Sequence, residues 1–242
     1  MSMVRCVEAE WLDELPPEDP RAMRSRRDMQ RVNRWMLQAG IMQRALTTGR
    51  GKLAPRVLLE LGAGDGSFML RLARRFAPHW KNVKVVLLDR QNIVSNETRE
   101  GIKALGWEVE TITADVFDFL EQAKHQPVDI ITANLFLHHF RNKILTQLLL
   151  QASRIADLFV ACEPRRSTLA LTGSRLLWAI GCNGVSRHDA VVSVRAGFTG
   201  QELSMLWPKQ TNWQLQEQAA GLFTHCFVAQ RLSEQGELRN EI

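Results

Sequence analysis

Three glycines at alternating positions follow a short apolar run and give the sequence its clearest candidate binding loop. The apolar run spans 57–61 and predicts a buried strand. The residues of the loop that concern a ligand are Gly62, Ala63, Gly64 and Gly66. Because glycine has no Cβ, a ligand can approach the backbone of such a loop closely. Glu60 lies at the carboxyl end of the expected strand, where open α/β sheets bind their ligands.

The spacing of the glycines distinguishes two kinds of nucleotide site. A nicotinamide or flavin fingerprint is Gly-x-Gly-x-x-Gly, and its third glycine would fall at Ser67. The observed spacing is Gly-x-Gly-x-Gly, and the neighbouring carboxylates of Glu60 and Asp65 would repel a pyrophosphate. The loop and the N-terminus of the following helix suit a polar ligand group, although a tight turn without a ligand remains an alternative.

This segment resembles motif I of the class I S-adenosylmethionine (SAM) methyltransferases, and the resemblance extends over roughly residues 56–230. SAM carries an ammonium group and a sulfonium, so an acidic residue beside the loop favours its binding. The resemblance implies SAM as the cofactor. It also implies a doubly wound, mostly parallel seven-stranded α/β sheet that ends in an antiparallel hairpin.

Two further acidic residues follow expected strands at suitable intervals. Asp89 comes 23 residues after Gly66, and its carboxylate could accept both ribose hydroxyls. Arg90 either packs its guanidinium on the adenine or is solvated. The resemblance places Asp115 at the adenine amine and the backbone of Val116 at a ring nitrogen, but Asp115 is equally suited to cap a helix.

The segment after the expected strand at 128–133 contains Asn134, which is assigned to the cofactor, and the pair His138 and His139. Its Leu-His-His element resembles the corresponding segment of many small-molecule methyltransferases. The Asn/Asp-Pro-Pro-Tyr/Phe tetrapeptide of nucleic-acid amino-methyltransferases is absent, which counts against base methylation. The histidines lack the spacing of metal ligands and have no carboxylate cluster in the sequence nearby, so no metal is expected. One of the two is expected to be structural.

A cap is expected at about 164–198, because this segment is longer than a simple connection. Its histidine, His188, is the first candidate for a general base, with His138 and His139 as the other catalytic candidates. The residues of the cap that we expect to contact a substrate are Trp178, Arg187, Asp189 and Arg195. An ordinary surface turn that leaves His188 exposed is the alternative.

Short apolar runs alternate with helical patterns, which predicts a parallel doubly wound sheet. The expected strands are 57–61, 84–88, 108–113, 128–133, 157–161, 213–218 and 222–230. The expected helices are 66–76, 93–105, 117–124, 141–153 and 199–206. Residues 56–242 are thereby assigned to the SAM-binding domain.

Residues 1–55 are expected to form an arm and helices that cover the cofactor crevice. The first twenty residues read as an irregular arm of net charge −5, and 21–47 as one or two helices broken near Gly40. Residues 48–51 read as a linker. The net charge of 21–56 is +9, which indicates either a solvated helix face or an anionic partner. Nucleic acid is not expected as a partner, because the segment has no interleaved aromatic residues beyond Trp35.

Composition is that of a globular protein: 45% of the 242 residues are hydrophobic, enough for one large α/β core. No apolar run approaches the roughly 18 residues of a membrane span, and no secretory leader is evident. The four separated cysteines suggest reduced thiols and a cytoplasmic location. The oligomeric state is left open.

The sequence therefore predicts methyl transfer from SAM to a small molecule. The cap and the segments 26–29 and 33–36 resemble a bacterial subgroup that acts on quinone-like or polyketide-like phenols, which implies O-methylation. The alternatives are a methyltransferase acting on RNA or protein, and a nucleotide-binding oxidoreductase.

Overall fold

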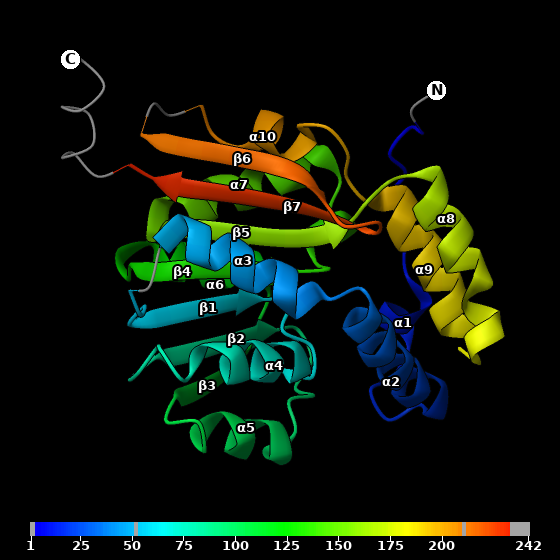
Figure 1. Cartoon of the computed structure of the whole chain (residues 1–242), viewed down its shortest axis with the longest axis horizontal. Helices are drawn as coiled ribbons and strands as arrows, with labels where there is room; N and C mark the ends of the chain where they lie inside the picture. Colours follow the sequence, from blue (N-terminus) through cyan, green and yellow to red (C-terminus); the bar gives the residue numbers. More distant parts are fainter. Residues whose placement is uncertain (1–2, 51–52, 210–211, 233–242) are drawn as a thin grey trace.

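The strands assemble into one sheet with helices on both faces, in a computed structural model that describes residues 3–50, 53–209 and 212–232 (Figure 1). The strand order is β3-β2-β1-β4-β5-β7-β6. The strands are β1 (Val57–Leu61), β2 (Lys84–Asp89), β3 (Glu108–Thr113), β4 (Val128–Asn134), β5 (Ala156–Pro164), β6 (Trp213–Ala220) and β7 (Thr224–Arg231). The first five are parallel, and β7 is antiparallel to both β5 and β6. This confirms the predicted fold class.

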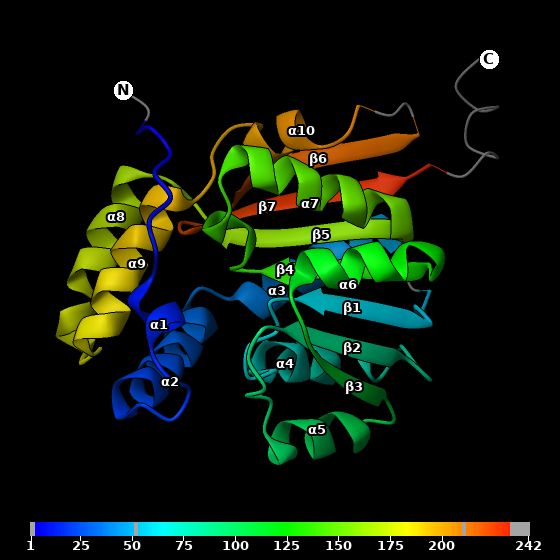
Figure 2. The same cartoon turned by 180° about the vertical axis from the view of Figure 1, so that it is seen from behind.

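Successive side chains of the central strands point to opposite faces of the sheet, as the pleat of a strand requires, and pack into two separate apolar cores. On β1, Leu58 packs into one core, and Leu59 and Leu61 pack into the other. The first core is covered by α3 (Gln38–Arg50), α4 (Ser67–Phe76) and α5 (Asn96–Lys103). The second is covered by α6 (Val116–Gln122), α7 (Asn142–Ile155) and α10 (Glu202–Leu206), seen in Figure 2.

The N-terminal region is more regular than its sequence suggests. Residues Trp11–Glu14 form a short helix, α1, inside the expected irregular arm. Helix α2 (Pro20–Trp35) begins with a proline at its first position and with the Asp19 side chain as its N-cap.

The helix break expected near Gly40 is present, but it lies a few residues earlier. The chain turns at Leu37, which has φ +55°, and Gly40 lies within α3. Burial of Ile41 and Met42 in the core outweighs the low helix propensity of glycine there. The helix also continues through the expected linker to Arg50, and Gly51 lies outside the described residues.

The cap consists of α8 (Thr168–Arg175), the 3₁₀ helix η3 (Leu176–Ile180) and α9 (Gly184–Ala196). Figures 1 and 2 show the cap together with α1 and α2 beyond the carboxyl ends of the parallel strands. Two further 3₁₀ turns are η1 (Ala123–His125) and η2 (Leu137–His139). Among the helices of the described ranges, none combines the length and apolar character needed to cross a membrane.

Candidate active site

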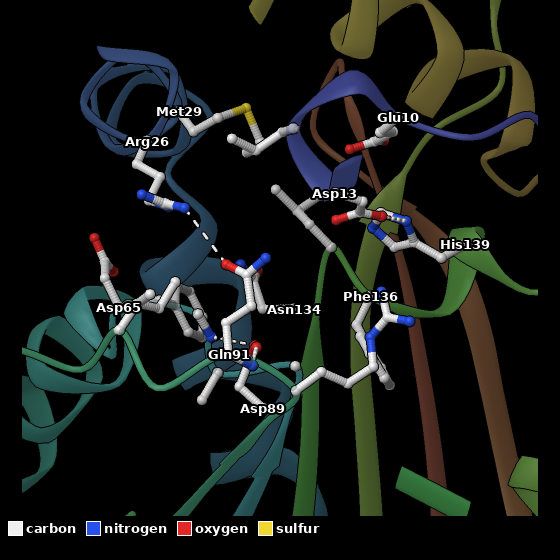
Figure 3. Close-up of a pocket in the computed structure, with 18 of the residues that line it drawn as sticks. Glu10, Asp13, Arg26, Met29, Asp65, Asp89, Gln91, Asn134, Phe136 and His139 are labelled. Atoms are coloured by element: carbon white, nitrogen blue, oxygen red, sulfur yellow. Dashed lines mark hydrogen bonds and ion pairs between the residues drawn. The ribbon is translucent and has the colours of Figure 1, made fainter. Parts of the chain in front are cut away.

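A cavity of about 700 Å³ opens at the carboxyl ends of β1, β2 and β4, with the N-terminal segment above it (Figure 3). One part of its wall is the glycine loop and the neighbouring strand ends. The residues expected to bind the cofactor all line it, namely Glu60, Gly62, Ala63, Gly64, Asp89, Arg90, Asp115, Val116 and Asn134. The sequence thus correctly identified the residues that meet at this edge of the sheet, whereas their individual roles remain predictions.

Glu60 is a buried carboxylate that lacks a full set of partners. Its Oε2 has no hydrogen-bond partner within the described residues, and the side chain is almost completely enclosed. Burial, reinforced by the negative charges of Asp65 and Asp89, raises the pKa of Glu60 well above its ordinary value. A cationic group bound at this point would restore the charged form. The ammonium group of SAM fits this requirement.

Asp89 fastens the glycine loop to the end of β2. Its Oδ2 accepts a hydrogen bond from the Gly64 N–H at 2.8 Å, and its Oδ1 accepts one from the Gln91 N–H at 2.8 Å. Each carboxylate oxygen has a second lone pair, so both can still accept from a ribose. The Asp115 side chain accepts from the Phe117 N–H at 2.8 Å and caps α6, which is compatible with an adenine contact as well.

Gly62 and Gly64 are required for different reasons, although both have positive φ. A Cβ at Gly62 would lie 2.2 Å from the ring of Phe136, whereas a Cβ at Gly64 would meet nothing within 4 Å. Gly62 therefore permits close packing of the loop against the segment after β4. Gly64 keeps the backbone open on the cavity side, where the methionine part of a cofactor would lie.

The family comparison agrees with this geometry. Residues 58–157 match the family described as "Methyltransferase domain" (Methyltransf_25). The chain contains a SAM-dependent methyltransferase domain. No sequence among the curated proteins matches the chain.

Solved structures share the fold of this methyltransferase at low sequence identity. The plantazolicin methyltransferase BpumL in complex with SAH is 13% identical with a TM-score of 0.64, and 88% of this chain and 91% of that chain are covered. An O-methyltransferase family protein from Burkholderia thailandensis is 17% identical with a TM-score of 0.58, covering 90% and 61%. The mitomycin 7-O-methyltransferase MmcR is 16% identical with a TM-score of 0.59, covering 91% and 60%. This methyltransferase thus spans about three fifths of the latter two chains.

The other part of the cavity wall comes from the N-terminal segment and the loop after β4. Residues Val7–Glu10 and Leu12–Glu14 line it, as do Phe136, His139 and Phe140. His139 Nδ1 lies 3.3 Å from Asp13 Oδ2, and both side chains point into the cavity (Figure 3). Sequence reasoning missed Asp13 and Glu10, because acidic residues in an expected irregular arm give no signal of a site.

His138, by contrast, is buried behind the wall between two carboxylates. Its Nδ1 lies 2.8 Å from Glu163 and its Nε2 lies 3.2 Å from Glu10. Burial alone would lower the pKa of His138, but its hydrogen bonds to the carboxylates of Glu10 and Glu163 raise it to about 9. The pKa of Glu10 falls to about 2 despite its burial, because of the same imidazolium. Glu163 also accepts the N–H groups of Phe136 and Leu137 and so organises the loop.

Three of these residues are also the only described group that could hold a metal ion. The potential ligand atoms of Glu10, His138 and His139 lie within 4.8 Å of one another. However, both nitrogens of His138 already have carboxylate partners, and a protonated imidazole has no lone pair for a metal. The arrangement fits a buried ion-pair cluster better than a metal site. The absence of a metal therefore stays a prediction.

The cap residues do not line the main cavity, contrary to the expectation for His188, Arg187, Arg195 and Trp178. The imidazole of His188 stacks on Trp11 with ring centroids 3.8 Å apart, on the far side of the N-terminal segment. The physical reason is that this segment lies between the cap and the strand ends.

Asp189 shows what the cap does instead. Its two carboxylate oxygens accept the backbone N–H groups of Trp11 and Leu12 at 2.9 and 3.0 Å. On the same helix, the Ser193 hydroxyl donates to Glu10. The cap therefore holds α1 in place over the cavity, while the residues of the N-terminal segment form the wall.

Proposed function

We propose that this methyltransferase transfers the methyl group of SAM to an oxygen atom of a small aromatic acceptor, such as a phenol, a quinol or a polyketide-like compound. The observation that carries the proposal is the pair of Asp13 and His139 in the cavity wall. The pair belongs to the same cavity as the glycine loop. Methylation of a hydroxyl benefits from a general base near neutral pH, and a histidine oriented by a carboxylate suits this role.

The lining of the cavity supports an acceptor with an aromatic ring. Leu12, Met29, Phe136 and Phe140 contribute apolar surface. The rings of Phe136 and Phe140 lie edge to face, with centroids 5.1 Å apart. Such walls favour a flat apolar ligand, and a few polar groups then fix its orientation. Two of the structural neighbours are named as O-methyltransferases, which agrees with an oxygen acceptor.

The residues of this chain would act mainly by position and proton transfer. SAM supplies an activated methyl group on its sulfonium when it is bound. The Nδ1 of His139 faces Asp13, so its Nε2 is the nitrogen that would accept the hydroxyl proton as the new C–O bond forms. Asp13 would stabilise the resulting imidazolium. The N-terminal segment would hold the acceptor in line and exclude water.

A matched pair of histidine variants tests this assignment. Release of S-adenosylhomocysteine (SAH) is measured with a panel of alkylated phenols and quinols, and with primary amines as the comparison. His139→Ala should reduce turnover by roughly 10²–10⁴-fold and leave SAH affinity unchanged. His188→Ala should retain turnover on the same acceptor, because His188 lies outside the cavity.

The opposite pattern would reject the assignment. If His188→Ala lost turnover and His139→Ala kept it, the base would belong to the cap. Methylation of the amines alone would reject the oxygen acceptor. In either case calorimetry with SAH would still test separately whether the protein binds the cofactor product of a methyltransferase.

A further inference from the structure

The cap carries three large apolar side chains that are more than half exposed. Leu169, Leu176 and Trp178 expose 53%, 52% and 61% of their surface, and all three come from the consecutive helices α8 and η3. Of these three, Trp178 also lines an open groove of about 390 Å³. It is lined by Trp11, Ser174, Arg175, Trp178, Gly184, Arg187, His188 and Val191. We propose that this surface, the cap face, docks on a lipid bilayer that contains anionic lipids.

The charge of the cap favours an anionic partner. Residues 165–198 contain five arginines and a single acid, Asp189; one of the arginines, Arg166, is buried and pairs with Glu202, which leaves four. Asp189 is buried and accepts hydrogen bonds from the α1 backbone, so it does not offset the charge at the surface. Arg175 and Arg187 are both exposed and both line the groove that contains Trp178. Arginine guanidinium groups there can bind phosphate oxygens of lipid headgroups.

Helix α2 extends this positive surface. The Arg24 guanidinium donates to the Gly181 carbonyl oxygen at 3.2 Å, and Asn183 Nδ2 donates to the Arg21 carbonyl oxygen at 2.8 Å. The first turns of α2 therefore lie directly beside the end of η3. The exposed Arg24 thereby adjoins the cap face. The arginine-rich start of α2, which the sequence alone would allow to be a solvated helix face, therefore adds to a mixed apolar and cationic surface.

The mixture of residue types distinguishes a bilayer from a nucleic acid. Tryptophan prefers the headgroup level of a membrane, where its ring is half in apolar surroundings. Exposed leucines next to it can enter the acyl boundary while the arginines stay at the phosphates. A nucleic acid would use the arginines and would gain nothing from Leu169 or Leu176. Docking of this kind needs no spanning helix and does not depend on the identity of the acceptor.

Vesicle sedimentation of the full chain tests the proposal. The protein should sediment with phosphatidylcholine vesicles that contain 30% phosphatidylglycerol, and it should remain in solution with phosphatidylcholine alone. Arg175→Gln with Arg187→Gln should lower the partition coefficient by roughly tenfold or more. Trp178→Ala should lower it independently of those charges. The matched controls are Arg154→Gln and Met205→Ala, which change exposed residues on α7 and α10 and should bind as the wild type does.

A second measurement separates insertion from simple charge attraction. Brominated lipids should quench part of the tryptophan fluorescence of the wild type. This quenching should be lost in Trp178→Phe. Thermal shift with SAH should be unchanged in each cap-face variant, which shows that the fold is intact. Equal binding to neutral vesicles, or undiminished binding of the double arginine variant, would overturn the proposal. The proposal would also be overturned if the protein bound both vesicles and single-stranded RNA, and if this binding required the arginines but not Trp178.

Discussion

The two parts of the cavity wall are held together in different ways. The cofactor part comes from the ends of neighbouring parallel strands, so the sheet itself brings Glu60, Asp89 and Asn134 together. The other part, called the acceptor part after its role in the proposed function, comes from the N-terminal segment and the loop after β4. Polar contacts attach the N-terminal segment to distant parts of the chain. Glu10 and His138 are 128 residues apart, and Trp11 and Asp189 are 178 residues apart. The acceptor part therefore depends on a few side chains and should be the easier one to disturb selectively.

The largest effect is expected from His138→Ala, which removes the cation between two buried carboxylates. Glu10 and Glu163 would then face each other uncompensated, which should cost about 3–5 kcal/mol of unfolding free energy. Urea denaturation measures the loss, and limited proteolysis should show earlier cleavage in residues 3–50.

His225→Ala is the matched control, because His225 pairs with Glu217 at 2.7 Å in the hairpin, away from the N-terminal segment. It should lower stability without promoting N-terminal cleavage. Identical cleavage patterns for the two variants would contradict the difference between the two parts of the wall.

A somewhat smaller effect is expected from pH. The pKa of His138 rises from 6.5 to about 9 on folding, so its contribution is complete below pH 6.5 and is lost as pH rises through 9. The pKa of Glu10 falls from 4.5 to about 2, so its contribution is present above pH 4.5 and is lost as pH falls through 2. The N-terminal segment should be held most firmly between pH 4.5 and 6.5.

Urea unfolding at pH 6, 7.5 and 9 measures this dependence. The wild type should lose up to about 3 kcal/mol over the series, since one pKa unit corresponds to about 1.4 kcal/mol. In His138→Gln most of that loss should disappear. If the unfolding free energy of this variant depended on pH as steeply as that of the wild type, groups other than His138 would be responsible.

The most local effects are expected from a pair of glycine substitutions within the cofactor part. Gly62→Ala and Gly64→Ala share the cost of about 1–2 kcal/mol for a side chain at positive φ. Gly62→Ala should lose about 1–3 kcal/mol more, because its Cβ would overlap the Phe136 ring. Gly64→Ala should instead weaken SAH binding by about tenfold. Calorimetry and thermal melts separate the two, and equal losses of stability would refute the distinct roles.

The difference between the two parts of the cavity wall also explains how much of the site could be predicted from the sequence. The residues of the cofactor part lie at the ends of neighbouring strands, so a local motif and its intervals were enough to predict that they line one cavity, while their contacts with the cofactor stay predictions. The position of the helix break was not predictable in this way, because burial around Ile41 and Met42 decides the conformation of Gly40.

The acceptor side was unpredictable for a related reason. The sequence around His138 and His139 contains no carboxylate cluster, yet the fold brings Glu10, Asp13 and Glu163 to them. His188 looked like a candidate base because Arg187 and Asp189 are its neighbours in sequence. His188 Nδ1 does lie 2.9 Å from Asp189 Oδ1, but the same carboxylate also accepts the α1 backbone N–H groups, and the intervening N-terminal segment separates the pair from the cavity.

The attachment of Trp11 to Asp189 also has a consequence for synthesis on the ribosome. The backbone N–H of Trp11 is made 178 residues before the carboxylate that accepts it. At about 5–20 residues per second, this delay is roughly ten to forty seconds. During that time the strands up to β5 can already form the sheet, whereas α1 and α2 can dock on the cap only after the cap has been synthesised. The enclosure of the active site is therefore expected to be a late step in the maturation of each new chain.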